Sequence, residues 1–310
     1  MPSSPQHLLT LEEFSSKELL ALLELAAKMK KKPAKYRKSL DGQCLAMIFD
    51  KSSTRTRVSF DVGMTQLGGK ALVLNGGELQ LGRGEPVSDT AKVLSRYVQG
   101  IMIRTFSHEM VEKLAKYSSV PVINGLTDTH HPCQVLADLQ TILENFKKIK
   151  GLQVVYVGDG NNMAHSLMMG SAKTGIHCRI VCPKDYQPQA SVVKTAQAEG
   201  KKTGSIIEIT QKVQGSVRGA DVVYTDVWTS MGQEAEKNKR LNDFKGFEVD
   251  EKLLGESPKA IFLHCLPAHR GEEVSAGVID GKRSRVWDQA ENRLHAQKAL
   301  MVTLMGDKKN

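Results

Sequence analysis

Hydroxyl and guanidinium side chains are concentrated in the Ser-Thr-Arg-Thr-Arg segment at residues 53–57, directly after an apolar run at 44–49. A turn from a strand into a helix offers an anion the free amides and the positive dipole end of the helix N-terminus, and arginine adds a bidentate, permanently charged fork. An ordinary capped helix with a basic surface is the alternative, because serine and threonine favour N-caps anyway. Two arginines in a first turn argue against it, since cations there are unfavourable unless an anion compensates them. The segment predicts a phosphate-type anion site.

Two later apolar runs in the same half also end in polar residues. The run at 101–103 leads into Arg104, and the run at 120–123 is followed by His131, Pro132 and Gln134. Proline suits the first position of a helix, and paired histidine and glutamine can hydrogen-bond a carbonyl oxygen and an amide, the groups of a carbamoyl unit. Taken alone, Arg104 fits an ordinary strand end equally well, and His131 fits a plain helix start.

The second half contains a glycine-rich turn, Gly-Asp-Gly-Asn-Asn at 158–162, after an apolar run at 154–157. This is how a dinucleotide-binding fingerprint opens, but position 163 holds methionine in place of the third glycine, and no acidic residue ends the next strand. The turn therefore argues against a nicotinamide-dependent dehydrogenase. A tight turn there can instead present Asn162 to the amino and carboxylate groups of a substrate.

Two further strand ends carry reactive groups. The run at 222–225 ends in Asp226, which can pair with an ammonium group or simply cap the loop that follows. The run at 260–263 leads into His264, Cys265 and, a little later, His269. A cysteine with two histidines is typical of a thiolate nucleophile or of a metal site. Only Cys265 is expected at the strand tip, however, so a polar lining residue remains the alternative.

The arrangement of the apolar runs predicts the elements that position these residues. Runs of strand length alternate with amphipathic segments, the pattern of a parallel sheet with crossover helices. They lie at 44–49, 71–74, 101–103, 120–123, 154–157, 179–182, 206–209, 222–224 and 261–263. Capping boxes at Thr10 and Ser15 predict two helix starts before the first strand.

A polar, lysine-rich segment at 144–151 separates two such series of strands. The chain is therefore predicted to be an α/β protein with two Rossmann-like domains, each a central parallel sheet flanked by helices, with the active site in the cleft between them. The first domain is expected to span residues 1–148 and the second 149–310. The last helix, at about 289–305, is expected to pack back on the first domain.

Composition excludes several classes of protein. With 40% hydrophobic and 25% charged residues among 310, the chain has enough apolar material for a core, but no apolar run approaches the length of a membrane span. The five cysteines are scattered and odd in number, which argues against a disulfide framework. A net charge of +9 fits nucleic acid or small anions, yet only 5% of the residues are aromatic. A solvated basic face is thus favoured over base stacking.

Four motifs stand in the order in which they occur in the carbamoyltransferase family. They are the 53–57 segment, His-Pro-Cys-Gln at 131–134, Asp226 with Ser-Met-Gly at 230–232, and His-Cys-Leu-Pro at 264–267. The last two resemble the branch of the family that uses ornithine. The aspartate branch typically has His-Pro-Leu-Pro at the fourth motif and lacks the Ser-Met-Gly loop. The resemblance covers essentially the whole chain.

This resemblance implies roles for individual residues. Carbamoyl phosphate would be held by Ser53, Thr54, Arg55, Thr56, Gln80, Arg104, His131, Gln134, Arg293 and the backbone of Cys265 and Leu266. Ornithine would be held by Asn162, Asp226, Ser230 and Met231. The catalytic residues would be Arg104, His131, Asp226 and Cys265, with either of the last two accepting the proton of the amine.

The resemblance also implies partners and setting. Gln80 lies in a loop at 76–86 that in the family reaches into a neighbouring subunit's site, which implies a homotrimer with sites at subunit interfaces. Family members work without a metal or an organic cofactor, and no nucleic acid or membrane partner is expected. The N-terminus has no secretory h-region, so the cytoplasm is expected, or the mitochondrial matrix after removal of a presequence. A carbamoyltransferase for putrescine, acetylornithine or aspartate is the nearest alternative.

Overall fold

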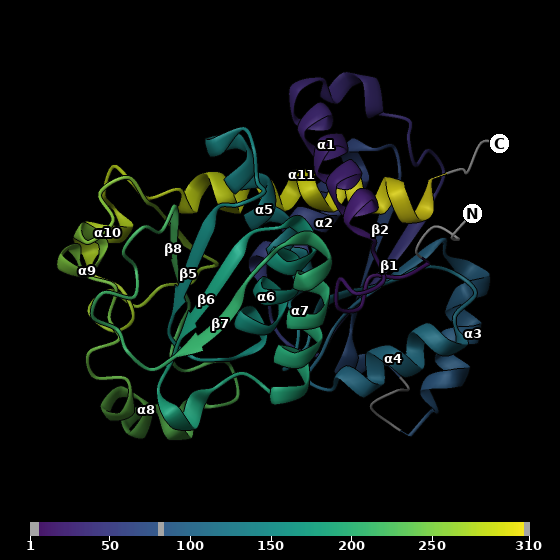
Figure 1. The fold of residues 1–310 in the computed structure, drawn as a ribbon. Helices are drawn as coiled ribbons and strands as arrows, with labels where there is room; N and C mark the ends of the chain where they lie inside the picture. The colour runs from purple at the N-terminus through teal and green to yellow at the C-terminus, as the bar shows by residue number, and fades with distance from the viewer. Residues whose placement is uncertain (1–5, 80–83, 307–310) are drawn as a thin grey trace. The chain divides into compact units, whose positions relative to one another are not determined.

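The computed structural model describes residues 6–79 and 84–306. These residues form two compact units, of which the first runs to Gln140 and resumes at Asn292, and the second runs from Thr141 to Glu291. Each unit contains one parallel sheet (Figure 1). The predicted α/β class, with two parallel sheets flanked by helices, is therefore confirmed.

The first unit has a four-stranded sheet in the order β2-β1-β3-β4. Its strands are β1 Cys44–Phe49, β2 Lys70–Asn75, β3 Gly100–Arg104 and β4 Val122–Leu126. Its helices are α1 Ser16–Lys31, α2 Thr54–Gln66, α3 Val87–Tyr97 and α4 His108–Tyr117, with the short η1 Pro33–Tyr36 and η2 Gly76–Glu78. The division between the units falls inside two further helices, α5 Pro132–Phe146 and α11 Val286–Met305.

The second unit has a five-stranded sheet in the order β7-β6-β5-β8-β9. Its strands are β5 Gln153–Val157, β6 His177–Val181, β7 Ile207–Thr210, β8 Val222–Thr225 and β9 Ile261–His264. Its helices are α6 Asn162–Thr174, α7 Ala190–Thr203, α8 Lys237–Asp243, α9 Glu251–Gly255 and α10 Ala276–Ile279, with η4 Lys184–Tyr186 and η5 Glu234–Glu236. Helices α6 and α7 pack against each other beside β6 and β7 (Figure 1).

Burial on both faces explains why the central strands read as continuous apolar runs, whereas the edge strand β2 has only exposed and half-buried residues. Strands β3 and β8 are buried at every position, and every residue of α6 from Met163 to Thr174 is buried. All nine predicted strands occur in the described part of the chain, with ends within two residues of the prediction except at β4, which ends three residues later, at Leu126. The predicted domain boundary at residue 148 stays a prediction.

One of the two predicted helix starts is wrong. Ser15 caps α1 with a complete capping box, because its hydroxyl accepts from the amide of Glu18 and the Glu18 carboxylate accepts from the amide of Ser15. No helix begins at Thr10. The Glu13 carboxylate accepts from the amides of Thr10 and Leu11, and Leu11 has a left-handed φ of 97°. The carboxylate closes a turn at this point rather than a helix.

Chain reversals at the two ends of the second sheet differ in character. The turns that lead into its first four strands each contain a glycine with positive φ, namely Gly151, Gly175, Gly204 and Gly219. Only glycine adopts this conformation without strain. The segments that leave the carboxyl ends of the strands instead carry the polar residues singled out above.

The order of each sheet has one point at which successive connections reverse direction. In the first unit this point lies between β1 and β3, and in the second between β5 and β8. Ligands of open parallel sheets bind at the carboxyl ends of the strands beside this point. The 53–57 segment follows β1, Arg104 is the last residue of β3, and Asp226 follows β8. The topology therefore selects these residues as candidates in each unit.

All five cysteines are free thiols, and burial raises the pKa of Cys133, Cys178 and Cys182 to about 12. These three therefore stay protonated and unreactive. None of the helices formed by the described residues combines the length and apolar composition needed to cross a bilayer.

Candidate active site

The predicted anion site is the start of α2. Ser53 is the N-cap, and its hydroxyl accepts from the amide of Thr56 at 3.1 Å. Thr54 and Arg55 are exposed in the first turn, whereas Thr56 is buried. The structure thus provides a helix N-terminus with two exposed arginines, Arg55 and Arg57, an arrangement that favours a bound anion.

Arg104 lies at the neighbouring strand end. It is the last residue of β3 and is in register with Phe49, the last residue of β1. Its carbonyl accepts from the amide of Asp50 at 2.9 Å, and the residue is only 7% exposed. A buried arginine at the switch point of the sheet is the position that the sequence predicts.

Arg293 connects the start of α5 with α2. Its Nη1 donates to Gln134 Oε1 at 2.6 Å and its Nη2 donates to Thr56 Oγ1 at 3.0 Å. All three side chains are buried, and α5 begins at Pro132 as predicted. Residues 237 positions apart in the sequence therefore form one hydrogen-bonded group.

His131 reports the charge that collects in this region. Its pKa lies well below the ordinary histidine value, first because the ring is buried and then because of the positive charges of Arg293, Arg104 and Arg55. Three guanidinium groups from three separate segments therefore act on one imidazole, which stays neutral near pH 7. A bound anion would compensate this accumulated charge.

The lowered pKa of His131 predicts that the stability of the fold depends on pH. Because the folded pKa is depressed, the unfolded chain binds a proton that the folded chain does not, and stability falls as pH drops below about 6.5. Urea denaturation of the protein and of His131→Gln between pH 5 and 8 should show a shallower fall for the variant. The slopes should differ by up to about 1.4 kcal/mol per pH unit.

Two other histidines of this unit do not obscure the comparison. Burial also lowers the pKa of His7 and His108, but both are present in the two proteins and their contributions cancel in the difference. Parallel stability curves for the protein and for His131→Gln would show that His131 is not held neutral.

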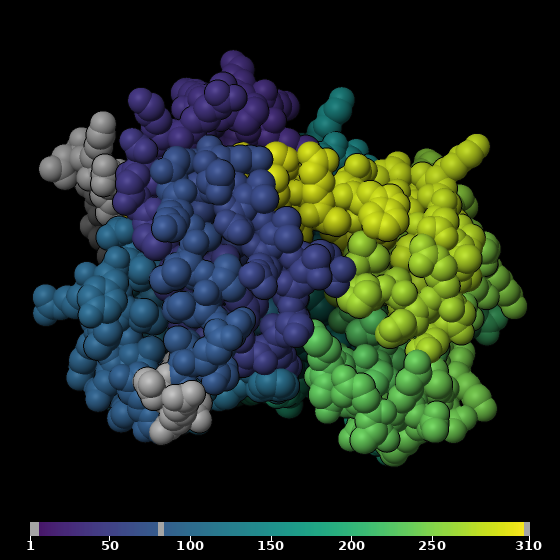
Figure 2. Space-filling model, turned by 180° about the vertical axis from the view of Figure 1, so that it is seen from behind, coloured from purple at the N-terminus to yellow at the C-terminus, as the bar shows by residue number. Residues whose placement is uncertain are grey.

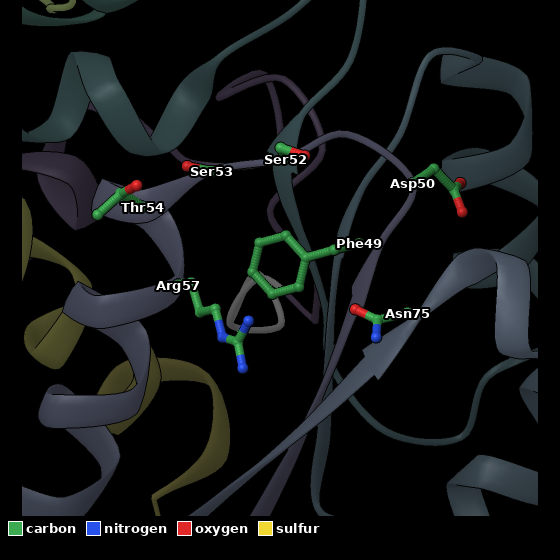
Figure 3. A pocket seen from close by; sticks show the side chains of 7 residues that line it. All are labelled: Phe49, Asp50, Ser52, Ser53, Thr54, Arg57 and Asn75. Carbon is green, nitrogen blue, oxygen red and sulfur yellow. The ribbon is translucent and has the colours of Figure 1, made fainter.

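A pocket of about 310 Å³ adjoins the start of α2. It is lined by Phe49, Asp50, Ser52, Ser53, Thr54, Arg57 and Asn75. Figure 3 shows Arg57 reaching in from α2 and Asn75 from the end of β2, with the Phe49 ring near the centre. The pocket shares Ser53 and Thr54 with the predicted phosphate site, and it places the second arginine of the motif, Arg57, beside that site.

In the second unit, Asp226 is the centre of a compact polar group. Its Oδ1 accepts from the Cys265 thiol at 2.8 Å, and its Oδ2 accepts from Asn161 Nδ2 at 3.1 Å. Asp226 is 6% exposed. The thiol acts as a hydrogen-bond donor to a carboxylate, and an adjacent negative charge disfavours a thiolate. This geometry argues against Cys265 as a covalent nucleophile.

The remaining predicted ornithine ligands lie on neighbouring segments. Asn162 is the first residue of α6, and Ser230 and Met231 lie in the loop after β8, where Met231 is 47% exposed. The amide of Ser230 donates to Gln233 Oε1 at 3.0 Å. Gln80, predicted to reach a neighbouring subunit, lies outside the described residues.

The backbone at Leu266 is held in an unusual conformation. Its φ of 57° is left-handed, a region that costs energy for a residue with a side chain. His264 Nδ1 accepts from the amide of Leu266 at 2.9 Å, while His264 Nε2 lies 3.2 Å from Glu273 Oε1. The histidine thus fixes the segment that carries Cys265 and Leu266.

Two clusters in the described chain have ligand atoms close enough for a metal ion. Asp226, His264 and Cys265 form one, and His269, Glu272 and Glu273 form the other, each with its ligand atoms within 4.8 Å of one another. Both are already joined by internal hydrogen bonds. The prediction that the reaction uses no metal stays a prediction.

Three supporting residues emerge only from the fold. Asn161 caps α6, accepting from the amide of Met163 at 2.9 Å while it donates to Asp226. Asp138 accepts from Gln134 Nε2 at 2.9 Å, which turns Gln134 Oε1 toward Arg293. Gln297, in the amide orientation that suits its neighbours, accepts from Arg293. The available signal was the i, i+4 spacing from Gln134 and from Arg293.

Comparison with known proteins agrees with this arrangement. Residues 6–144 match the carbamoyl-P binding domain of aspartate/ornithine carbamoyltransferase, and residues 150–304 match its Asp/Orn binding domain. The chain is 56% identical over 300 residues to an ornithine carbamoyltransferase of Anoxybacillus flavithermus, covering 96% of each protein.

Solved structures agree in fold as well. Ornithine carbamoyltransferase from Pyrococcus furiosus superposes with a TM-score of 0.95 at 52% identity, covering 99% of both chains. Ornithine transcarbamoylase from Giardia lamblia superposes with a TM-score of 0.90 at 38% identity, covering 99% of this chain and 100% of the other. With both of its domains matched along nearly their whole length, the chain belongs to the aspartate/ornithine carbamoyltransferase family.

Proposed function

We propose that this chain transfers the carbamoyl group of carbamoyl phosphate to the δ-amine of L-ornithine, giving L-citrulline and phosphate. The observation that carries the proposal is the convergence of Arg55, Arg104 and Arg293 on the neutral, buried His131. Ornithine as the acceptor is supported by the names of the relatives and by the Asp226–Cys265 pair.

The phosphate group of carbamoyl phosphate binds at the start of α2. There the free amides, the Ser53 and Thr54 hydroxyls and the Arg55 guanidinium meet its negative charge. Neutralising that charge also makes phosphate a better leaving group.

The carbamoyl carbonyl is polarised by Arg104, His131 and the Thr56 hydroxyl. Because His131 is neutral, one of its ring nitrogens carries a hydrogen that it can donate to the carbonyl oxygen. The ring holds no second proton that the reaction would have to remove. Gln134 binds the carbamoyl amide. These donors stabilise the oxyanion that develops as the carbon becomes tetrahedral.

The δ-amine of ornithine attacks after losing a proton. Its ordinary pKa resembles that of lysine, about 10.4, and a cationic, desolvated surrounding lowers it. The amine nitrogen forms a bond to the carbamoyl carbon, the bond from that carbon to the phosphate oxygen breaks, and phosphate leaves. Asp226 orients the amine and accepts its proton, with the Cys265 thiol donating to the same carboxylate. Asn162, Ser230 and Met231 hold the amino-acid end of ornithine.

Citrulline formation tests the proposal directly. The protein is incubated with carbamoyl phosphate and ornithine, and citrulline is measured against a reaction without enzyme. No citrulline above that background would sink the proposal. Putrescine, acetylornithine and aspartate tested at equal concentrations separate the nearest alternatives, and a tenfold preference for any of them would reassign the acceptor.

We propose further that the protein works as a homotrimer with Gln80 of one copy completing the site of the next. Support comes from exposed apolar side chains of the first unit, Val58 and Val62 on α2 and Leu72 on β2. Figure 2 shows one face of the first unit, where residues of the indigo and blue part of the chain are at the surface. Mixing inactive Gln80→Ala and Arg55→Ala proteins after dissociation should restore activity, which a monomer cannot do.

Cellular setting and cofactor use belong to the same proposal. The enzyme is placed in the cytoplasm, or in the mitochondrial matrix after removal of a presequence, as part of arginine biosynthesis, and it works without a metal or an organic cofactor. Full activity after dialysis against a chelator, and growth of a bacterial arginine auxotroph that lacks this step, are the expected results.

A further inference from the structure

The loop after β8 is fastened by a single guanidinium group. Arg240, on α8, donates through Nη1 to the carbonyl of Trp228 at 2.9 Å and to Asp159 Oδ2 at 2.8 Å. Its Nε donates to Glu236 Oε2 at 3.1 Å. The Arg240 side chain therefore contacts three segments. It contacts the β8 loop at Trp228, two residues after Asp226, the end of that loop at Glu236, and the turn after β5 at Asp159.

Asp159 stands in the same turn as the residue that positions Asp226. Asn161, two residues farther along, donates to Asp226. The turn after β5 thus makes two connections to the β8 loop, one to its first residue and one, through Arg240, to Trp228. Asp159 and Arg240 are only 6% and 7% exposed, so water screens their interaction little.

Aromatic packing supports the same point of the loop. The Trp228 ring stacks on Phe244 with centroids 5.4 Å apart, and the Arg240 guanidinium lies 4.9 Å from the centroid of the Tyr186 ring. Beyond Trp228 the loop bonds mainly to itself, since the amide of Gly232 donates to Glu234. The Ser-Met-Gly segment is consequently held in place through Trp228.

We propose that Arg240 and Asp159 are a pair of positioning residues that fixes the β8 loop in the conformation that recognises the amino-acid acceptor. The inference rests on the proposed function and names residues outside the predicted substrate contacts. Neither residue touches the atoms that react. Loss of the pair therefore weakens binding of the acceptor and leaves the affinity for carbamoyl phosphate, whose predicted side-chain contacts are in the other unit, as it was.

Arg240 and Asp159 act together because they carry opposite charges. Removing Arg240 leaves the buried Asp159 as an uncompensated charge, and removing Asp159 leaves Arg240 paired with Glu236 alone. Either change displaces the segment that carries the remaining charge. Asp159 also stands close enough to Asp226 for the two negative charges to repel, and Arg240 offsets that repulsion.

The test uses Arg240→Gln, Asp159→Asn and the double variant in the full-length protein. The KM for ornithine should rise about tenfold to a hundredfold in each, with kcat at saturating ornithine little changed. Calorimetry should give an unchanged Kd for carbamoyl phosphate. If the pair is one unit, the double variant should be no worse than the more affected single variant.

Arg179→Gln is a matched control in the same unit. Arg179 also binds one carboxylate and one carbonyl, at 2.9 Å to Glu208 and 2.6 Å to the carbonyl of Ser216, but it does not contact the β8 loop. This variant should lose thermal stability without a change in KM. A rise in KM equal to that of Arg240→Gln would assign the effect to general destabilisation and overturn the proposal.

Fluorescence gives a readout independent of activity. In a Trp287→Phe background, Trp228 is the remaining tryptophan, and at 5% exposure it is shielded from acrylamide. Arg240→Gln should increase its quenching. If Arg240→Gln does not fold, Asp159→Asn, which keeps the shape of the side chain, decides by the same measurements.

The outcomes separate the two proposals. An unmodified protein that makes no citrulline overturns the proposed function. An active protein whose variants keep the original KM for ornithine and the original quenching overturns the positioning role alone. A parallel loss of affinity for both substrates overturns it as well.

Discussion

Replacing Arg55 by alanine is expected to lower turnover by about 10²- to 10³-fold, the usual loss when one donor to a developing or departing charge is removed. The affinity for carbamoyl phosphate should fall in parallel, because the guanidinium is an exposed cation in the first turn of α2. Stability should be maintained, since alanine is a better helix former than arginine. Calorimetric titration with carbamoyl phosphate measures the loss, and thermal denaturation measures the stability.

Arg96→Ala is the matched control for this experiment. Arg96 is an exposed arginine in the last turn of α3, so its removal changes the net charge of the protein by the same amount. Its carbamoyl phosphate affinity should stay that of the unmodified protein. Equal affinities for Arg55→Ala and Arg96→Ala would remove Arg55 from the phosphate site.

Replacing Asp226 by asparagine is expected to reduce kcat by about 10²- to 10⁴-fold, as the loss of a general base does. Asparagine keeps the size of the side chain and can still pair with Asn161 and Cys265, but it cannot take up a proton or attract the ammonium form of ornithine. Steady-state kinetics with ornithine varied at saturating carbamoyl phosphate measures the effect. Carbamoyl phosphate binding should be unaffected.

Cys265→Ser distinguishes the two candidate proton acceptors. A serine hydroxyl can donate to Asp226 as the thiol does, so if Asp226 is the base the variant should retain far more activity than Asp226→Asn. The reverse order would make Cys265 the proton acceptor.

The strands and their order of appearance were readable because burial on both faces leaves uninterrupted apolar runs. The same reasoning placed the 53–57 segment and Arg104 at neighbouring strand ends of the first sheet, and Asp226 at a strand end of the second sheet. The failure at Thr10 has a local cause. A hydroxyl and a carboxylate three residues apart satisfy a turn as well as a helix start.

Two of the residues that act through others, Asn161 and Arg240, could not be singled out from the sequence. Asn161 and Asn162 are adjacent and chemically identical, and only the geometry shows that Asn161 binds Asp226. Arg240 lies 81 positions from Asp159 in an exposed, charge-rich stretch, so its burial depends on the tertiary fold. Long-range pairs of this kind need the fold before they can be recognised.

Glycines with positive φ precede β5, β6, β7 and β8, so the turns at the amino-terminal ends of these strands differ from the polar segments at their carboxyl ends. Insertions, reporter groups or immobilising tags placed beside Gly151, Gly204 or Gly219 enter open space, since a Cβ at these positions would meet no neighbour within 4 Å. The glycines themselves are kept, because their positive φ would strain any other residue. These three glycines lie before the amino-terminal ends of the strands, whereas Asp226 and the Asp159 that Arg240 binds follow the carboxyl ends. A sensor or a surface-bound catalyst built on this protein can therefore be modified at the amino-terminal ends of the strands, while the polar residues at the carboxyl ends stay unchanged.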